Sequence, residues 1–113
     1  MSGDSRLPTH LEVSGLIRMV EAAGGFAAVL AKGERDAGSI LIICCEPGRP
    51  DRLFERMPDM EGGRRWSLSR TQDIENPRDF SEYWMRRRDQ DSDLWIVELV
   101  IADGERFIAS LGT

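Results

Sequence analysis

The chain has 113 residues, of which 41% are hydrophobic and 31% charged, and its formal net charge is −5. This length and composition predict one soluble domain, residues 1–113, that can bury a core without disulfides or metal. The acidic charge disfavours a general nucleic-acid binder. No apolar run approaches the roughly 20 residues of a membrane helix, and no signal-peptide pattern follows Met1, so we expect a cytoplasmic protein that does not contact membranes.

Residues 1–8 are expected to be flexible, and a first helix is expected from Thr9. Thr9 and Glu12 have the spacing of a capping box, in which each side chain hydrogen-bonds a free backbone N–H at the helix start. Gly24 and Gly25 should end the helix, one of them in the left-handed conformation. One helical stripe should be buried at the i, i+3, i+4, i+7 spacing. It consists of Val13, Leu16, Ile17 and Val20.

A second helix is expected after Asn76. Asn76 is a favourable capping residue, and Pro77 suits the first helical position because the N–H that it lacks would have no partner there. The aromatic side of this helix should pack on the sheet. Its members are Phe80, Tyr83 and Trp84, with Arg87 on the same face.

The strand pattern centres on residues 39–45, an apolar run whose two faces both predict burial. A second segment of similar apolarity spans residues 94–101, and these two should form the middle of the sheet. Residues 26–31 should pair with 39–45 as a hairpin. Shorter strands are expected at 53–57 and 65–70.

These elements predict an α+β fold: a single domain with a mainly antiparallel sheet of four or five strands and two helices packed on it. Asp103 and Gly104 indicate a tight turn near the end of the chain. After this turn, Phe107 and Ile108 are expected to fold back as a short strand or turn.

The two cysteines, Cys44 and Cys45, should point to opposite faces of the central strand, where a disulfide between them would be strained. His10 is the only histidine, so no zinc ligand set of cysteines and histidines can be assembled. We interpret both cysteines as reduced core residues and expect no metal and no cofactor. The aspartates from Asp89 to Asp93 lack the glycine and the glutamate of a calcium loop, and a polar turn is expected there.

Arginine and aromatic residues occur together in two elements, residues 64–70 and 83–88. If these elements are neighbours, guanidinium groups could hold phosphates while aromatic rings stack on bases. We favour the alternative, in which the aromatic residues belong to the core and the arginines pair with acids. The candidate binding residues of this cluster are Arg64, Arg65, Trp66, Arg70, Arg87 and Arg88.

Glu98 is the one acid in the apolar segment 94–101 and is a further candidate binding residue. A carboxylate on a buried strand either pairs with an arginine or marks a site. The arginines considered for this pairing are Arg65, Arg87 and Arg106. General acid–base chemistry would require a second group, for which the sequence offers only Glu46 or Glu55. No residue is assigned a catalytic role.

Five segments together resemble a family. They are residues 11–18 (LEVSGLIR), 21–27 (EAAGGFA), 33–42 (GERDAGSILI), Arg65–Trp66, and 93–98 (DLWIVE). They are similar to a small alphaproteobacterial domain-of-unknown-function family, numbered fourteen-ninety-one, whose members have about this length. The resemblance implies a stand-alone bacterial protein without an assigned activity, so it transfers no catalytic residue.

We expect a non-enzymatic protein-binding or adaptor domain that acts on a protein partner or through self-association as a homodimer. No convergent set of polar residues indicates catalysis, and apolar strands can leave a sheet edge open to a partner. Two alternatives remain. One is an anion or single-stranded nucleic-acid binder that uses the arginine clusters, and the other is a small enzyme centred on Glu98 with an arginine.

Overall fold

A computed structural model describes residues 7–112, so the predicted flexible segment 1–8 lies almost wholly outside the described residues. The described part contains three helices and five strands. In chain order they are α1 (Thr9–Ala22), β1 (Phe26–Ala31), β2 (Ile40–Cys45), β3 (Arg52–Pro58), β4 (Arg64–Thr71), α2 (Pro77–Gln90), β5 (Trp95–Val100) and α3 (Gly104–Ser110). No helix within residues 7–112 combines the length and apolarity needed to cross a bilayer.

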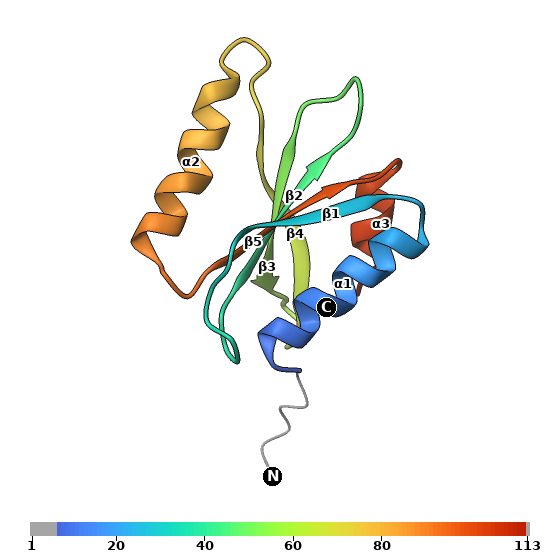
Figure 1. The fold of residues 1–113 in the computed structure, drawn as a ribbon, viewed down its shortest axis with the longest axis vertical. Coiled ribbons are helices and arrows are strands. Elements are labelled where there is room, and N and C mark those ends of the chain that lie inside the picture. The colour runs from blue at the N-terminus through green and yellow to red at the C-terminus, as the bar shows by residue number, and fades with distance from the viewer. Residues whose placement is uncertain (1–6, 113) are drawn as a thin grey trace.

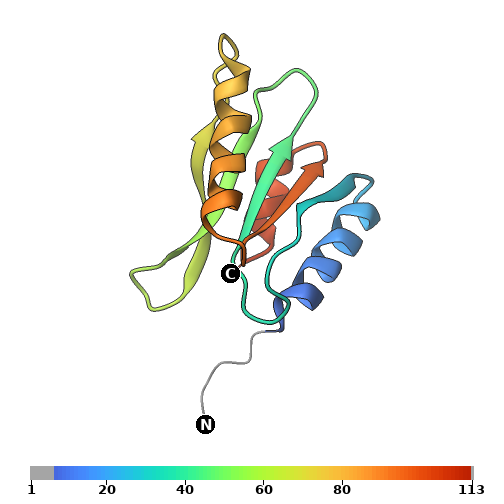
Figure 2. The same cartoon turned by 60° about the vertical axis from the view of Figure 1, so that its left-hand side comes forward.

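The strands form one sheet in the order β1-β5-β2-β3-β4. α2 covers one face of this sheet, while α1 and α3 lie on the other (Figures 1 and 2). The predicted α+β class is therefore confirmed, with one helix more than expected. The sheet is mixed: β1–β5, β2–β3 and β3–β4 are antiparallel, and only β2–β5 is parallel.

The two most apolar strands, β2 and β5, are neighbours in the middle of the sheet, as predicted. The predicted hairpin of residues 26–31 with 39–45 is wrong, because β5 lies between β1 and β2. Contacts from the loop after β1 stabilise this arrangement. The Glu34 N–H donates to the Asp93 carbonyl at 2.9 Å, and Trp95 Nε1 donates to the Glu34 carbonyl at 2.7 Å. The loop thus pairs with the start of β5.

Each central strand buries both of its faces, since alternate side chains enter different cores. The core under α1 and α3 contains Ile40, Ile42 and Cys44 from β2, and Trp95, Val97 and Leu99 from β5. The core under α2 contains Leu41 and Ile43 from β2, Ile96 from β5 and Phe80 from α2. The predicted division of β2 between two layers is confirmed, and Cys44 and Cys45 are free thiols on opposite faces.

The start of α1 differs from the predicted capping box. Pro8 occupies the capping position, and no side chain caps the helix. The Thr9 hydroxyl instead donates to the Gly38 carbonyl at 2.9 Å, while Glu12 binds Arg56. These long-range partners replace the local bonds, because Thr9 is buried where α1 meets the loop before β2. At the other end of α1, Gly24 has the left-handed conformation (φ 89°), as expected.

The last element is a helix, α3, where a short strand or turn was expected. Asp103 adopts a left-handed backbone conformation (φ 53°). The Glu46 carboxylate accepts the N–H groups of Asp103 and Gly104, each at 3.1 Å. Because a helix start needs acceptors for its free N–H groups, this distant side chain favours a helix. Ile108 then packs into the core on the same face as α1.

Candidate functional site

The predicted arginine surface occupies β4 and the second half of α2, where acids bind most of its guanidinium groups. Arg65 lies 3.6 Å from Asp59 and Arg88 lies 3.4 Å from Asp89. Arg64 and Arg87 line the same cavity. The start of β4 therefore lies near the end of α2.

Tyr83 joins the rest of this cluster. The guanidinium of Arg70 lies 4.1 Å from the centre of the Tyr83 ring and 3.4 Å from the Asp79 carboxylate. Arg87 donates to the Tyr83 hydroxyl at 2.9 Å and also binds Glu55. Hydrogen bonds from Arg87 hold the pKa of Glu55 below its usual range. An incoming phosphate would have to compete with these carboxylates.

Trp66 lies on the opposite face of the sheet from the aromatic residues of α2. It packs against the core under α1 and α3, whereas Tyr83 and Trp84 pack against the core under α2. Arg56 lies over the Trp66 ring, 4.7 Å from its centre, and also binds Glu12. The structure therefore brings Arg70 and Arg87 together around Tyr83 but separates Trp66 from them by the thickness of the sheet.

Glu98 lies in a cavity of about 430 Å³ between α2 and the sheet. The lining includes Trp84 and Phe80 from α2, Ile43 from β2, and Asp51 from the loop before β3. The Cys45 thiol donates to Glu98 Oε2 at 3.7 Å. Among residues 7–112, no arginine or lysine forms an ion pair with Glu98.

The Cys45 thiol is held in its neutral form by this environment. Burial raises the pKa of Cys45, and the nearby carboxylates of Asp51 and Glu98 raise it further. Glu46 and Glu55, the two acids considered as catalytic partners of Glu98, are bound by Arg52 and Arg87 instead. A thiol with a raised pKa is a poor nucleophile, so these contacts do not assemble a nucleophile with a base.

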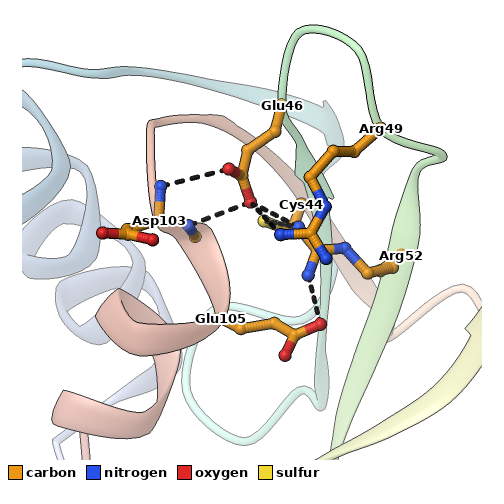
Figure 3. Close-up of polar contacts among 7 residues, drawn as sticks. Cys44, Glu46, Arg49, Arg52, Asp103 and Glu105 are labelled. Atoms are coloured by element: carbon orange, nitrogen blue, oxygen red, sulfur yellow. Dashed lines mark hydrogen bonds and ion pairs between the residues drawn. The ribbon is translucent and has the colours of Figure 1, made fainter.

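A network of charged residues links β2, β3 and α3 (Figure 3). Arg52 is only 3% exposed, and its guanidinium binds Glu46 and Glu105. It also contacts the Cys44 sulfur at 3.7 Å. The hydrogen bond from Arg52 is the main cause that lowers the pKa of Glu46. Because the arginine is enclosed and its two carboxylates are already bound, this network stabilises the junction and does not present a binding surface.

β1 forms one edge of the sheet and has an unusual composition for an exposed edge. Its sequence, FAAVLA, contains no charged residue and no proline. Phe26 is 73% exposed and Val29 is 41% exposed. Val100, the cross-strand neighbour of Phe26, is 37% exposed. The opposite edge, β4, carries three arginines.

Both faces of the sheet are hollowed beside β1. On the α1 side, Val29 lines a groove of about 490 Å³ together with Val13, Ile17 and Trp95. Lys32 and Arg35 also line this groove and give it a basic rim. On the α2 side, Leu30 lines the cavity that contains Glu98.

The sequence prediction missed the β1 edge as a specific surface, although it anticipated an open edge. The available signal was the absence of charge and proline from residues 26–31, because natural edge strands usually carry such residues against unwanted pairing. The predicted strand order was wrong because it paired residues 26–31 with residues 39–45, and it did not identify 26–31 as the edge strand.

Comparisons with known proteins agree with this fold. A family model described as "Protein of unknown function (DUF1491)" matches residues 7–109. The structure is similar to the crystal structure of a DUF1491 family protein from Caulobacter crescentus CB15, with a TM-score of 0.74 and 32% sequence identity over 90% of this chain and 94% of that chain.

Two solution structures are also similar. An NMR structure of a DUF1491 family protein from Caulobacter crescentus CB15 has a TM-score of 0.74 and 33% identity, with coverage of 90% of this chain and 92% of that chain. Protein Atu0922 from A. tumefaciens has a TM-score of 0.70 and 35% identity, with coverage of 87% and 88%. No curated protein sequence matches significantly. The chain belongs to the DUF1491 family of bacterial proteins of unknown function.

Proposed function

We propose that this protein is a binding domain that takes up an extended segment of a partner protein along β1. The observation that carries the proposal is the uncharged, proline-free edge strand with Phe26 and Val29 exposed. An edge strand has one row of backbone N–H and C=O groups without strand partners, and an added strand can bind them while side-chain pockets provide selectivity.

The hollows on both faces support this mode of binding. Successive side chains of a strand point to opposite faces, so a segment beside β1 would place alternate side chains in the α1 groove and over the α2 cavity. Val29 lines the first hollow and Leu30 lines the second. Each hollow thus offers apolar contact to one half of the docked side chains.

The charges around β1 favour a different protein over a second copy as the occupant. The α1 groove has Lys32 and Arg35 at its rim, and the α2 cavity contains Glu98. Residues 26–31 of a second copy would bring no charged side chain to either hollow. A partner segment could complement both hollows if it placed an acidic side chain in the α1 groove and a basic side chain in the α2 cavity.

The experiment is site-specific photo-crosslinking in a bacterial host of the family. A photoreactive phenylalanine derivative replaces Phe26, and a matched variant carries it at Leu68. Leu68 is 50% exposed on the opposite edge strand, β4. We expect one dominant covalent adduct from position 26 and none from position 68, with the crosslinked peptide of the partner identified by mass spectrometry.

Several outcomes would contradict the proposal. Equal adducts from both positions would indicate nonspecific contact. The absence of adducts from position 26 would show that β1 is not a docking edge. An adduct of twice the mass of the chain would replace the proposed partner with a second copy, because β1 would then pair with itself.

A further inference from the structure

Glu98 differs from the other half-buried glutamates in its partners. Glu12, Glu46 and Glu55 each bind an arginine. Glu98 accepts one hydrogen bond, from the Cys45 thiol at 3.7 Å, within the described part of the chain. A thiol is a weak donor, so this carboxylate has no strong donor among the described protein groups. In a chain with 14 arginines, this lack of a cation is notable.

The cavity around Glu98 has the features that a large organic cation needs. Trp84 and Phe80 supply aromatic surface, and Leu30 and Ile43 supply an apolar floor. Aromatic faces attract ammonium and guanidinium groups, and the methylene chain of such a residue can pack on apolar surface. Asp51 adds a second carboxylate to the same cavity.

The neighbouring edge strand leaves Glu98 accessible. Ala28 of β1 is the cross-strand partner of Glu98. Because strands lie about 4.8 Å apart, a segment beside β1 would lie about two strand spacings from β5. The methyl group of Ala28 is the only side chain at that register position between them. An arginine or lysine side chain is long enough to extend across it.

We propose that the Glu98 cavity binds the guanidinium or ammonium group of an arginine or lysine side chain, presented by the segment that docks on β1. The source of the cation rests on the proposed function, while the cavity's preference for an alkyl cation does not. Glu98 supplies the charge-assisted acceptor, Asp51 adds negative potential, and Trp84 and Phe80 contact the alkyl chain.

The alternative occupant, an anion, fits this cavity less well. Arg78 lines it at the start of α2, but two carboxylates lie in the same space and would repel a phosphate or a carboxylate. Among the described residues, Arg78 forms no ion pair with either acid. With two carboxylates and one arginine, the lining therefore carries a net negative charge.

Agmatine, an alkyl chain with a guanidinium group at one end and an ammonium group at the other, tests the cavity without a partner protein. It is titrated into the full chain labelled with ¹⁵N, and amide and indole signals are followed by NMR. We expect saturable shifts at Ala28, Ile43, Glu98 and the Trp84 indole, with a dissociation constant that is roughly millimolar, as for other small charged ligands. Pentan-1-ol, which has no charge, should cause shifts at least about tenfold weaker at equal concentration.

The Glu98→Gln variant keeps the side-chain shape and removes the charge. It should weaken agmatine binding about tenfold, whereas Glu82→Gln, an exposed change on α2, should alter it by less than about twofold. The spectra also report whether each variant is folded. No saturable shift at these residues, or equal affinity for wild type and Glu98→Gln, would overturn the inference.

The two proposals can fail separately. Crosslinks from position 26 without agmatine binding would leave β1 as a docking edge and remove the cation site. Agmatine binding that depends on Glu98, without crosslinks, would leave a cation site for a free ligand and remove the docked segment as its source.

Discussion

Arg87 of α2 donates hydrogen bonds of 3.1 and 3.0 Å to the two carboxylate oxygens of Glu55 on β3. This pair holds the second half of α2 against the sheet. Phe80, in the first half, is the only buried residue of the helix. Since α2 also provides Trp84 to the Glu98 cavity, the Arg87–Glu55 pair helps to fix one wall of the proposed cation site.

Replacement of Glu55 by Gln should lower the free energy of unfolding at pH 7 by about 1–2 kcal/mol, because a charge-assisted pair becomes a weaker neutral contact. The effect should depend on pH. The hydrogen bond from Arg87 lowers the pKa of Glu55 in the folded state. Glu55 therefore makes its full contribution to stability above its pKa in the unfolded chain, about 4.3. This contribution is lost as the pH falls through the lower pKa of the folded state.

Urea unfolding between pH 7 and pH 3 measures this difference. Wild type should lose more stability than Glu55→Gln as the pH falls below about 4.3. Parallel stability curves for the two proteins would show that the pair contributes nothing to acid sensitivity.

The buried Arg52 should be far more important for stability than its exposed neighbour Arg49. Arg52→Met leaves Glu46 without its main cation in a nearly closed site, and should cost about 3 kcal/mol. Arg49→Ala removes a guanidinium that is 54% exposed and 3.9 Å from the same carboxylate, and should cost less than about 0.5 kcal/mol. Thermal and urea unfolding compare the stabilities of the two variants. Similar losses of stability would show that burial does not decide how much each arginine contributes.

Gly104 should not tolerate a side chain, for a steric reason. A Cβ built at this position would lie 2.0 Å from the Cys44 sulfur, in the core under α3. We expect Gly104→Ala to lower the free energy of unfolding by about 2 kcal/mol through overpacking. In a Cys44→Ala background the same change should cost clearly less, because the clashing atom is absent. A double-mutant cycle measures this coupling, and strictly additive losses would exclude the clash.

Cys45 should react slowly with iodoacetamide, and faster when Glu98 loses its charge. Burial and the carboxylates of Asp51 and Glu98 raise the pKa of the thiol, and only the thiolate is nucleophilic. Glu98→Gln removes one of these negative charges, so the thiolate fraction and the alkylation rate at pH 8.5 should rise. Mass spectrometry in a Cys44→Ala background follows Cys45 alone, with Glu82→Gln as the unaffected control. A slower reaction in Glu98→Gln would contradict the expectation that the Glu98 charge suppresses the Cys45 thiolate.

Local sequence patterns predicted the elements well, and long-range contacts decided the rest. The apolar runs of β2 and β5 identified the middle of the sheet because burial on both faces requires apolar residues throughout. The order of β1 depended instead on how the loop containing Glu34 pairs with Asp93 and Trp95. α3 depended on Glu46, which is 58 positions away from Gly104. Neither contact has a local sequence signal.

The candidate site was predictable only in part. Glu98 could be selected because a single acid in an apolar strand is unusual, and the structure places it in a cavity. Its lack of a cation could not be foreseen, since pairing with an arginine is decided by the tertiary neighbours. The arginine clusters were visible in the sequence. The acids that pair with them, such as Glu55 for Arg87 and Asp79 for Arg70, lie in other helices or strands.

The position of β5 also has a consequence for synthesis of the protein. Residues 95–100 separate β1 from β2 in the sheet, yet they leave the ribosome after both. Until then, α1 with β1 and the β2-β3-β4 meander are two pieces whose inner edges lack their shared neighbour. The sheet can close only when the last strand enters between them. A nascent chain stalled before residue 95 should therefore expose two apolar edges, and should be a substrate for chaperones that bind extended apolar segments.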